Sequence, residues 1–155
     1  FRDLREETFE LDSVEVRTML LSHPGYCLGY RLSANGKTLC YVTDNELFES
    51  DDARHSPTYV DRLADFVREA DILVTDTCYS DEEYPRFVGY GHSSVSQVAC
   101  LADKGAVKTL HIFHHDPDQD DDAIDAKLES ARATLAELGS STQCEAPAEG
   151  QSITL

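Results

Sequence analysis

Apolar runs of strand length end in an ionisable side chain at three places, and this pattern constrains the fold more than any other feature. The run 39–43 ends at Asp44, the run 19–22 at His23 and the run 110–113 at His114. A side chain at the C-terminal end of a buried strand lies on a rigid element and faces a crevice. Singly, each is more typical of a strand end that bonds to backbone. Together, two imidazoles and a carboxylate predict a metal site.

The dipeptide Asn35-Gly36 predicts that two of these side chains are neighbours. Both residues tolerate positive φ, and Asn-Gly between two apolar runs is a strong signal for a β-hairpin. The flanking strands, 27–32 and 37–43, would then pair with each other. This pairing brings the start of the first strand and the end of the second to one edge, so we expect His23 and Asp44 to lie close together.

The remaining pattern predicts a mixed α/β fold in a single domain of residues 1–155. Antiparallel strands come first, and helices alternate with strands from residue 58 onward. Residues 77–90 are irregular and aromatic, as in a loop over a pocket, and Ser93 is expected to cap the following helix. The expected strands are 8–11, 14–21, 27–32, 37–43, 71–76, 107–113 and a short last strand at 151–155, and the expected helices are 58–69, 93–104 and 121–138.

Charge and cysteine usage narrow the class of protein. Thirteen basic residues stand against 30 acidic ones, a formal net charge of -17. A field of this sign repels phosphate backbones, so we do not expect general nucleic-acid binding. The five cysteines are odd in number and lack CxxC spacing, which indicates reduced, structural thiols in a cytoplasmic protein. We expect neither a membrane span nor a signal peptide.

Two further side chains extend the metal hypothesis. Imidazole and carboxylate ligands suit Zn, Mn or Fe better than Ca or Mg, but three ligands are too few for a two-ion hydrolytic site. His92 is either a capping or loop histidine, or a group that stabilises an oxyanion or protonates a leaving group. Asp76, at a strand end beside the same helix, could orient such a histidine. The other histidines are expected to be structural (His115), solvent-exposed (His55) or without an assigned role (His111).

These motifs follow one another in a recognisable order along nearly the whole chain. They are Leu21-Ser22-His23-Pro24 with Gly29-Tyr30-Arg31-Leu32, then Tyr41-Val42-Thr43-Asp44, Ala70-Asp71-Ile72-Leu73-Val74-Thr75-Asp76, Gly91-His92-Ser93-Ser94, and Leu110-His111-Ile112-Phe113-His114-His115-Asp116-Pro117. In this order they resemble the metallo-β-lactamase fold superfamily, in the branch that contains ribonuclease Z and small phosphodiesterases. The resemblance implies half of an αββα sandwich, with a mixed sheet and helices on one face.

The resemblance also implies roles for individual residues. His23 resembles the third ligand to the first metal, Asp44 the carboxylate that bridges both metals, and His114 the last ligand to the second metal. His92 resembles the histidine that aids the phosphoryl transition state, with Asp76 as its acidic neighbour. The complete site would hold two divalent transition-metal ions, either Zn or else Mn or Fe.

One departure from the superfamily is large. Its His-x-His-x-Asp-His run, which supplies four metal ligands, occurs nowhere from Phe1 onward. The chain therefore resembles the C-terminal half of the sandwich, and the N-terminal half is either truncated or a separate chain that completes the site. One face of the sheet would then be exposed. We expect the isolated chain to bind metal weakly and to lack hydrolase activity. A homo-oligomer is a further possible assembly of this chain.

A second departure narrows the substrate of the metal-dependent hydrolase that the resemblance implies. Ribonuclease Z-like enzymes carry a long RNA-grasping insertion where this chain has the short turn Ser33-Ala34-Asn35-Gly36. With the acidic surface, the short turn disfavours tRNA and favours a small-molecule phosphodiester such as a cyclic nucleotide. Two alternatives stay open: a non-catalytic sensor or interaction module on the same fold, and a thioester or lactone hydrolase.

Overall fold

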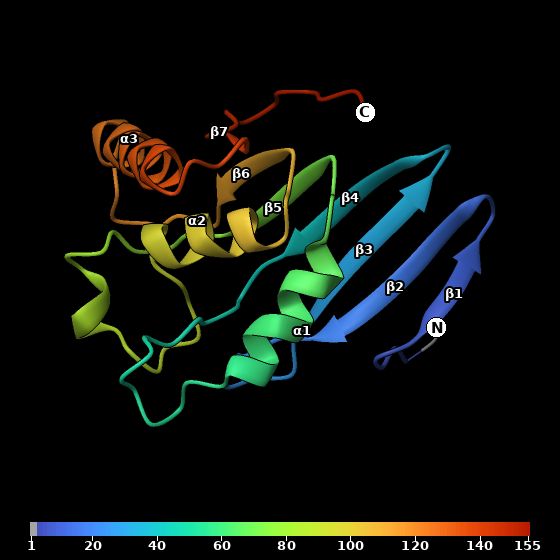
Figure 1. Cartoon of the computed structure of the whole chain (residues 1–155), viewed down its shortest axis with the longest axis horizontal. Helices are drawn as coiled ribbons and strands as arrows, with labels where there is room; N and C mark the ends of the chain where they lie inside the picture. Colours follow the sequence, from blue (N-terminus) through green and yellow to red (C-terminus); the bar gives the residue numbers. More distant parts are fainter. Residues whose placement is uncertain (1–2) are drawn as a thin grey trace.

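Seven strands form one sheet in the computed structural model of the chain, which describes residues 3–155 (Figure 1). The strands are β1 (Thr8–Leu11), β2 (Val14–Leu20), β3 (Leu28–Ala34), β4 (Lys37–Val42), β5 (Ile72–Asp76), β6 (Thr109–Phe113) and β7 (Gln143–Glu145). The helices are α1 (Pro57–Val67), α2 (Val95–Lys104), α3 (Asp121–Glu137) and the short 3-10 helix η1 (Tyr84–Arg86). Within the described residues, none of the helices has both the length and the apolar character needed to cross a bilayer.

The strands follow one another across the sheet in sequence order. The pairs from β1 to β4 are antiparallel, and those from β4 to β7 are parallel. Asn35 adopts a φ of 52° and the Ala34–Lys37 pair closes the predicted hairpin. Because two antiparallel pairings separate β2 from β4, these strands run in the same direction as β5 and β6. The C-terminal ends of all four therefore lie on one edge of the sheet.

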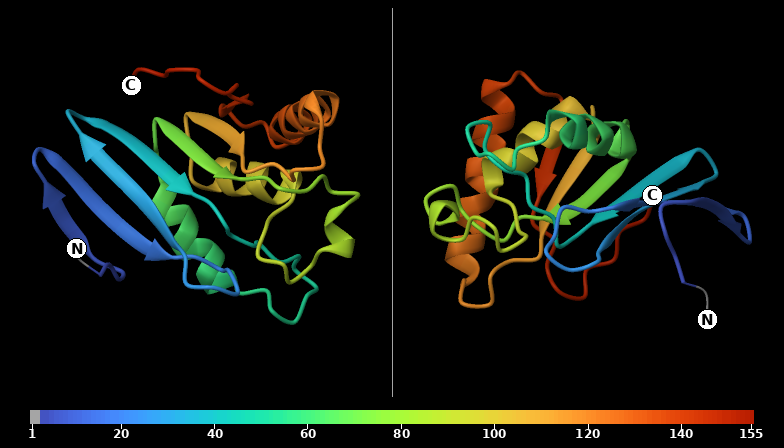
Figure 2. Two further views of the ribbon diagram at one scale, coloured as in Figure 1. Left: turned by 180° about the vertical axis from the view of Figure 1, so that it is seen from behind. Right: turned by 90° about the horizontal axis from the view of Figure 1, so that it is seen from below.

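Helices α1, α2 and α3 connect successive parallel strands and lie on the same side of the sheet, as Figure 2 (right) shows. The hydrophobic core fills the space between this helical layer and the sheet. Leu63 and Phe66 of α1 and Val98 of α2 are buried there against Leu73 of β5 and Leu110 of β6. The predicted mixed sheet with helices on one face is confirmed.

The opposite face of the sheet carries apolar side chains that are only partly covered. Strand alternation places Leu20, Tyr41 and Phe113 on this face, where they are 41%, 39% and 40% exposed. The rings of Tyr41 and Phe113 lie 6.4 Å apart. The segment that follows β7 runs on this side of the molecule (Figure 2, right). The described residues therefore bury one face of the sheet more completely than the other.

The N-cap of helix α2 lies one residue later than predicted. Its N-cap is Ser94, whose backbone N–H donates to the Gln97 side chain (2.9 Å). Ser93 is buried and has another use: its hydroxyl donates to the Asn45 carbonyl (2.6 Å) and accepts from the Leu47 N–H (3.0 Å). The prediction of Ser93 as the cap was wrong because that hydroxyl ties two loops together.

The last strand also differs from the prediction. Residues 151–155 are exposed and form no strand, whereas Gln143–Glu145 forms β7, where no strand was predicted. Gly139, at a φ of 68°, follows the end of α3, and the chain turns back at once to pair with β6. Cys144 is buried on the helical side of the sheet and contributes to the core, which favours this short strand over the polar tail.

Candidate metal centre

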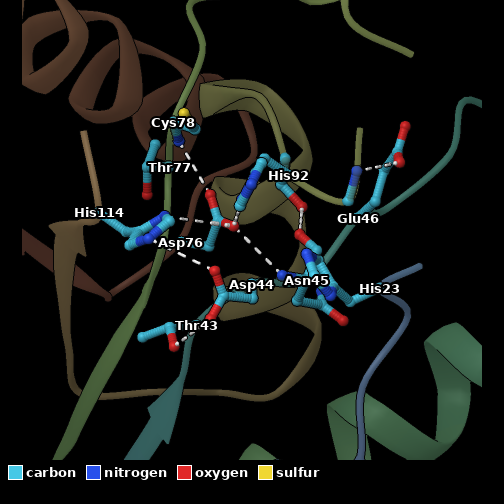
Figure 3. Close-up of polar contacts among 12 residues, drawn as sticks. His23, Thr43, Asp44, Asn45, Glu46, Asp76, Thr77, Cys78, His92 and His114 are labelled. Carbon is cyan, nitrogen blue, oxygen red and sulfur yellow. Dashed lines mark hydrogen bonds and ion pairs between the residues drawn. The ribbon is translucent and has the colours of Figure 1, made fainter. Parts of the chain in front are cut away.

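The edge where β2, β4, β5 and β6 end gathers the side chains that the sequence singled out (Figure 3). His23 lies three residues beyond β2, Asp44 two residues beyond β4, and Asp76 is the last residue of β5. His114 follows β6 directly, and His92 comes from the loop before α2. Four strand ends and one loop, far apart in the sequence, therefore bring all five side chains together at this edge.

Two of these residues leave their strands in the left-handed backbone region. Asp44 has a φ of 48° and His114 a φ of 56°, values that are uncommon for residues other than Gly and most frequent among Asn, Asp and His. Thr43 Oγ1 donates to Asp44 Oδ2 (3.3 Å), and His114 Nε2 lies 3.4 Å from Asp44 Oδ1. Backbone conformations of this kind cluster at functional sites, where the surrounding structure holds them.

His92 and Asp76 form the most tightly defined pair in the crevice. His92 Nδ1 lies 2.5 Å from Asp76 Oδ2, and the Asp76 side chain is fully buried. Asp76 also accepts the backbone N–H of Asn45 (3.2 Å) and of Cys78 (3.0 Å). The hydrogen bond that His92 donates to this carboxylate raises the pKa of His92, against the opposing effect of burial. Because Asp76 engages Nδ1, the other ring nitrogen, Nε2, is left to act in the crevice.

His23 is held against His92 by a close approach of backbone. The centroids of the two rings are 5.7 Å apart. Gly91 has a φ of 97°, and a Cβ at this position would overlap the ring of His23 and the side chain of Pro24. The Gly25 N–H donates to His23 Nδ1 (3.0 Å). A glycine is therefore required directly before His92 for both rings to fit.

Glu46 is a site residue that the sequence analysis missed, because it belongs to none of the motifs at the strand ends. Its side chain is buried and accepts the N–H of Gly89 (2.6 Å) and of Gly91 (2.9 Å) and the hydroxyl of Tyr84 (3.0 Å). These bonds attach the loop that carries His92 to the end of β4. The apolar pair Leu47-Phe48 directly after Glu46 was the available signal that this segment turns inward.

Lys127 on α3 stabilises the segment that follows β5 at this edge of the sheet. Its ammonium group is buried and donates to the carbonyls of Thr77 (2.7 Å) and Cys78 (3.1 Å), the two residues that follow Asp76. Burial lowers the pKa of Lys127 to about 8. The sequence does not single out this residue, because lysine is rarely buried and nothing in its local pattern indicates burial.

The histidines outside the crevice are only partly as predicted. His55 is half-buried, with Nδ1 2.8 Å from the Phe48 carbonyl, so the prediction that it is exposed was wrong. His111 is buried on β6, and its Nε2 lies 3.4 Å from a carboxylate oxygen of Glu145. Burial lowers the pKa of His115 to about 4. Neutral His115 is therefore favoured at physiological pH, which fits a structural role.

All five cysteines are free, as predicted. Cys40, Cys78 and Cys144 are buried, and Cys100 is exposed on α2. Burial raises the pKa of Cys78 to about 12 and the pKa values of Cys40 and Cys144 to about 11. These buried groups are therefore thiols at neutral pH unless a metal replaces the proton.

The described residues fit a metal ion in two overlapping groups. His23, Asp44 and His92 each offer one ligand atom, and the three atoms lie within 4.8 Å of one another. Cys78, His92 and His114 meet the same condition. His114 Nδ1 is buried and has no hydrogen-bond partner among residues 3–155. The structure therefore brings His23 and Asp44 together as predicted, with His92 beside them and His114 Nε2 3.4 Å from Asp44 Oδ1.

Comparison with known proteins agrees with this arrangement. Residues 4–115 match the family model described as the Beta-lactamase superfamily domain. Ribonuclease Z of Thermoplasma acidophilum is 27% identical over an alignment of 167 positions, gaps included, that covers 85% of this chain and 54% of that protein. Ribonuclease Z of Thermoplasma volcanium is 33% identical over 76 residues, which cover 49% of this chain and 24% of that protein.

Solved structures share the fold at low sequence identity. Unliganded yeast PDE1 gives a TM-score of 0.70 at 14% identity, covering 94% of this chain and 47% of that one. The metallo-β-lactamase fold protein YhfI from Bacillus subtilis gives 0.66 at 13% identity, covering 91% and 50%. The chain spans about half the length of the T. acidophilum relative and of these two structures. The match over residues 4–115 shows that the chain belongs to the β-lactamase superfamily, and its sheet and helices share the metallo-β-lactamase fold over about half of these structures.

Proposed function

We propose that the chain is the C-terminal part of a metal-dependent hydrolase that cleaves a small phosphodiester such as a cyclic nucleotide. The observation that carries the proposal is the convergence of His23, Asp44, His114 and the His92–Asp76 pair on one crevice. The donor set of imidazoles and a carboxylate suits Zn, with Mn or Fe as the other choices.

His23, Asp44 and His114 would hold the ions from this chain, and the remaining ligands would come from the complementary half of the sandwich. When bound, two such ions polarise a phosphoryl oxygen and supply a hydroxide nucleophile at neutral pH. The left-handed backbone at Asp44 and His114 and the close packing of Gly91 on His23 fix the three side chains before any ion binds. Preorganisation of this kind favours a precise site.

His92 would protonate the leaving oxygen or stabilise charge on the phosphoryl group. Asp76 engages Nδ1 and raises the pKa of His92, so the protonated ring is favoured and Nε2 can donate into the crevice. The Glu46 carboxylate holds the preceding loop in place through Gly89 and Gly91. In this scheme Asp76 and Glu46 position the histidine and do not touch the substrate.

The substrate class rests on the surface of this chain. The connection between β3 and β4 is a tight hairpin, and the net charge of -17 repels a long polyanion. The T. acidophilum and T. volcanium relatives are both named Ribonuclease Z, which makes an RNA phosphodiester the competing substrate. The five free thiols fit the reducing conditions of the cytoplasm.

The complementary half is the partner that the proposal requires. The chain aligns with about half of the T. acidophilum relative, and the sheet face opposite the helices leaves Leu20, Tyr41 and Phe113 partly exposed. A second half-sandwich packed on this face would bury them and complete the ligand set. A non-catalytic module and a thioester or lactone hydrolase remain the other functions that the same fold could serve.

The test compares this chain alone with its assembly with a segment that carries the His-x-His-x-Asp-His run. Metal content is measured by mass spectrometry, and hydrolysis is followed with cyclic AMP, bis(p-nitrophenyl) phosphate and a precursor tRNA. We expect the assembly to hold about two ions per site and to cleave the small phosphodiesters, and the chain alone to do neither. The His92→Ala assembly should retain its ions and lose about 10²- to 10⁴-fold in kcat.

Each outcome separates the alternatives. Hydrolysis and a full complement of ions in the chain alone would show that it is not half of a site. A folded assembly without metal would support the non-catalytic module. A faster reaction with the precursor tRNA would replace the small phosphodiester by RNA.

A further inference from the structure

The second ligand group contains a sulfur that the proposed hydrolytic centre does not use. Cys78 Sγ and one ring nitrogen from each of His92 and His114 lie within 4.8 Å of one another. We propose that Cys78, His92 and His114 form an alternative site for a thiophilic metal ion, of the class of Cd²⁺ or Cu⁺, which overlaps the proposed hydrolytic centre. This site needs only residues of this chain, so it does not depend on the proposed hydrolase activity.

The position of Cys78 is fixed by its backbone on both sides. Its N–H donates to Asp76 Oδ1 (3.0 Å), and its carbonyl accepts from Lys127 Nζ (3.1 Å). The Thr77 N–H donates to the carbonyl of Phe113 (2.9 Å), directly before His114. The sulfur is therefore held beside the end of β6 by main-chain bonds, and the three ligands need no rearrangement of strands to meet.

Both histidines have a nitrogen that the proposal can assign to an ion. Asp76 engages Nδ1 of His92, so the proposal uses the other ring nitrogen, Nε2, as the ligand atom. His114 Nδ1 is buried and makes no hydrogen bond among residues 3–155, and its polar neighbour Asp76 Oδ2 lies 3.8 Å away. A buried polar atom without a partner is uncommon in a folded protein, and an ion is one group that would satisfy it. This observation points to a ligand independently of the cysteine.

The two overlapping groups differ in the ions that they favour. Sulfur and two imidazoles make a softer set than the two imidazoles and carboxylate of His23, Asp44 and His92. An ion that binds at Cys78 replaces the thiol proton, which passes to solvent, and no electron is transferred. His92 and His114 would then serve the sulfur-containing site. A thiophilic ion therefore competes with the ions of the proposed hydrolytic centre and would act as its inhibitor.

The experiment titrates the purified chain with Cd²⁺ and, separately, with Mn²⁺, and compares wild type with Cys78→Ser and Cys100→Ser. In Cys78→Ser we expect the Kd for Cd²⁺ to rise about tenfold or more and the thiolate-to-cadmium absorption band to disappear. The Kd for Mn²⁺ should stay within about twofold, because Mn²⁺ prefers oxygen and nitrogen ligands. Cys100→Ser, which removes an exposed thiol on α2, should change none of these quantities.

Persistence of the cadmium band and affinity in a folded Cys78→Ser variant would overturn the proposal, as would an equal loss of Mn²⁺ affinity. A second measurement on the wild-type chain needs no variant. In histidine-ring NMR spectra, Cd²⁺ should shift the signals of His92 and His114 together and leave those of His55 and His111 in place. Shifts of His23 and His92 without His114 would assign the ion to the other group and contradict the proposal.

Discussion

At the scale of single residues, the crevice depends on backbone conformations that few side chains accept. Asp44 and His114 hold positive φ directly after strands, and Gly91 holds a φ of 97° against the ring of His23. A non-glycine residue in such a region costs about 1 to 3 kcal/mol and persists only where its surroundings enforce it. The positions of these ligand side chains therefore depend on backbone conformations that the surrounding structure holds.

Replacement of Gly91 by Ala should be more costly than the same change at Gly36. Both glycines have positive φ, but a Cβ at Gly36 meets nothing within 4 Å, whereas one at Gly91 overlaps His23. We expect Gly36→Ala to lower the free energy of unfolding by about 1 kcal/mol and Gly91→Ala by about 2 to 4 kcal/mol. Urea unfolding of both variants measures the difference. Equal losses would show that the contact with His23 has no energetic weight.

At the scale of elements, two loops from opposite ends of the site are joined by buried hydrogen bonds. Glu46 binds Gly89 and Gly91, and Ser93 bridges Asn45 and Leu47. The aromatic segment is also packed internally, with Tyr79 and Phe87 stacked at 4.5 Å. The loop before α2 is thus held in place beside the candidate ligands by these contacts. The sequence alone predicted only an irregular loop over a pocket.

The exchange of backbone amides should reveal this attachment. In Glu46→Gln one carboxylate oxygen becomes an amide that cannot accept the loop N–H groups, which costs about 1 to 3 kcal/mol of buried hydrogen bonding. We expect the amides of Gly89 and Gly91 to exchange faster with solvent deuterium in this variant. The matched control, Glu49→Gln, changes a carboxylate whose bond to Gln97 is exposed and should leave both amides as they are. Unchanged exchange in Glu46→Gln would contradict the role of Glu46.

The contact between α3 and the end of β5 makes a prediction about pH. The folded state lowers the pKa of Lys127 from 10.5 to about 8, so between these values the unfolded chain binds more protons and stability rises with pH. Buried cysteines, whose pKa values are raised, oppose this rise only where the thiols of the unfolded chain ionise, near pH 9 and above. Lys127→Met should therefore lack a rise that wild type and the exposed control Lys104→Met retain, as measured by urea unfolding from about pH 7 to 9. An identical pH dependence in Lys127→Met would refute this assignment.

At the scale of the whole molecule, the sheet is covered by helices on one face and leaves apolar side chains partly exposed on the other. The strand order β1 to β7 places Tyr41 on the central strand β4 and Phe113 two strands away on β6, with their rings 6.4 Å apart. Partly exposed apolar groups gathered on one face are typical of an interaction surface. This arrangement agrees with a chain that spans about half of the relatives and structures that it resembles.

Assembly with the complementary half should fail when this face is charged. Tyr41→Glu places a carboxylate in the proposed interface but replaces a side chain that is already 39% exposed, so the chain itself should lose no more than about 1 kcal/mol. Leu138→Glu, at the end of α3 on the helical side, is the matched control. Co-purification with a segment that carries the His-x-His-x-Asp-His run measures assembly. Normal assembly of Tyr41→Glu would place the interface elsewhere.

The sequence by itself determined most of the elements and the group of residues at the sheet edge. Periodicity located the helices, Asn35-Gly36 located a hairpin, and polar residues at strand ends pointed to His23, Asp44 and His114, because these signals are local. The sequence could not identify Glu46 and Lys127 as buried groups, because charged residues are usually exposed to solvent. Their burial depends on hydrogen-bond partners from other elements, the Gly89 N–H for Glu46 and the Thr77 carbonyl for Lys127. Nor could it show that Cys78 meets His92 and His114. Only the tertiary structure decided these contacts, because each joins segments whose distance in space is set by the pairing order of the sheet.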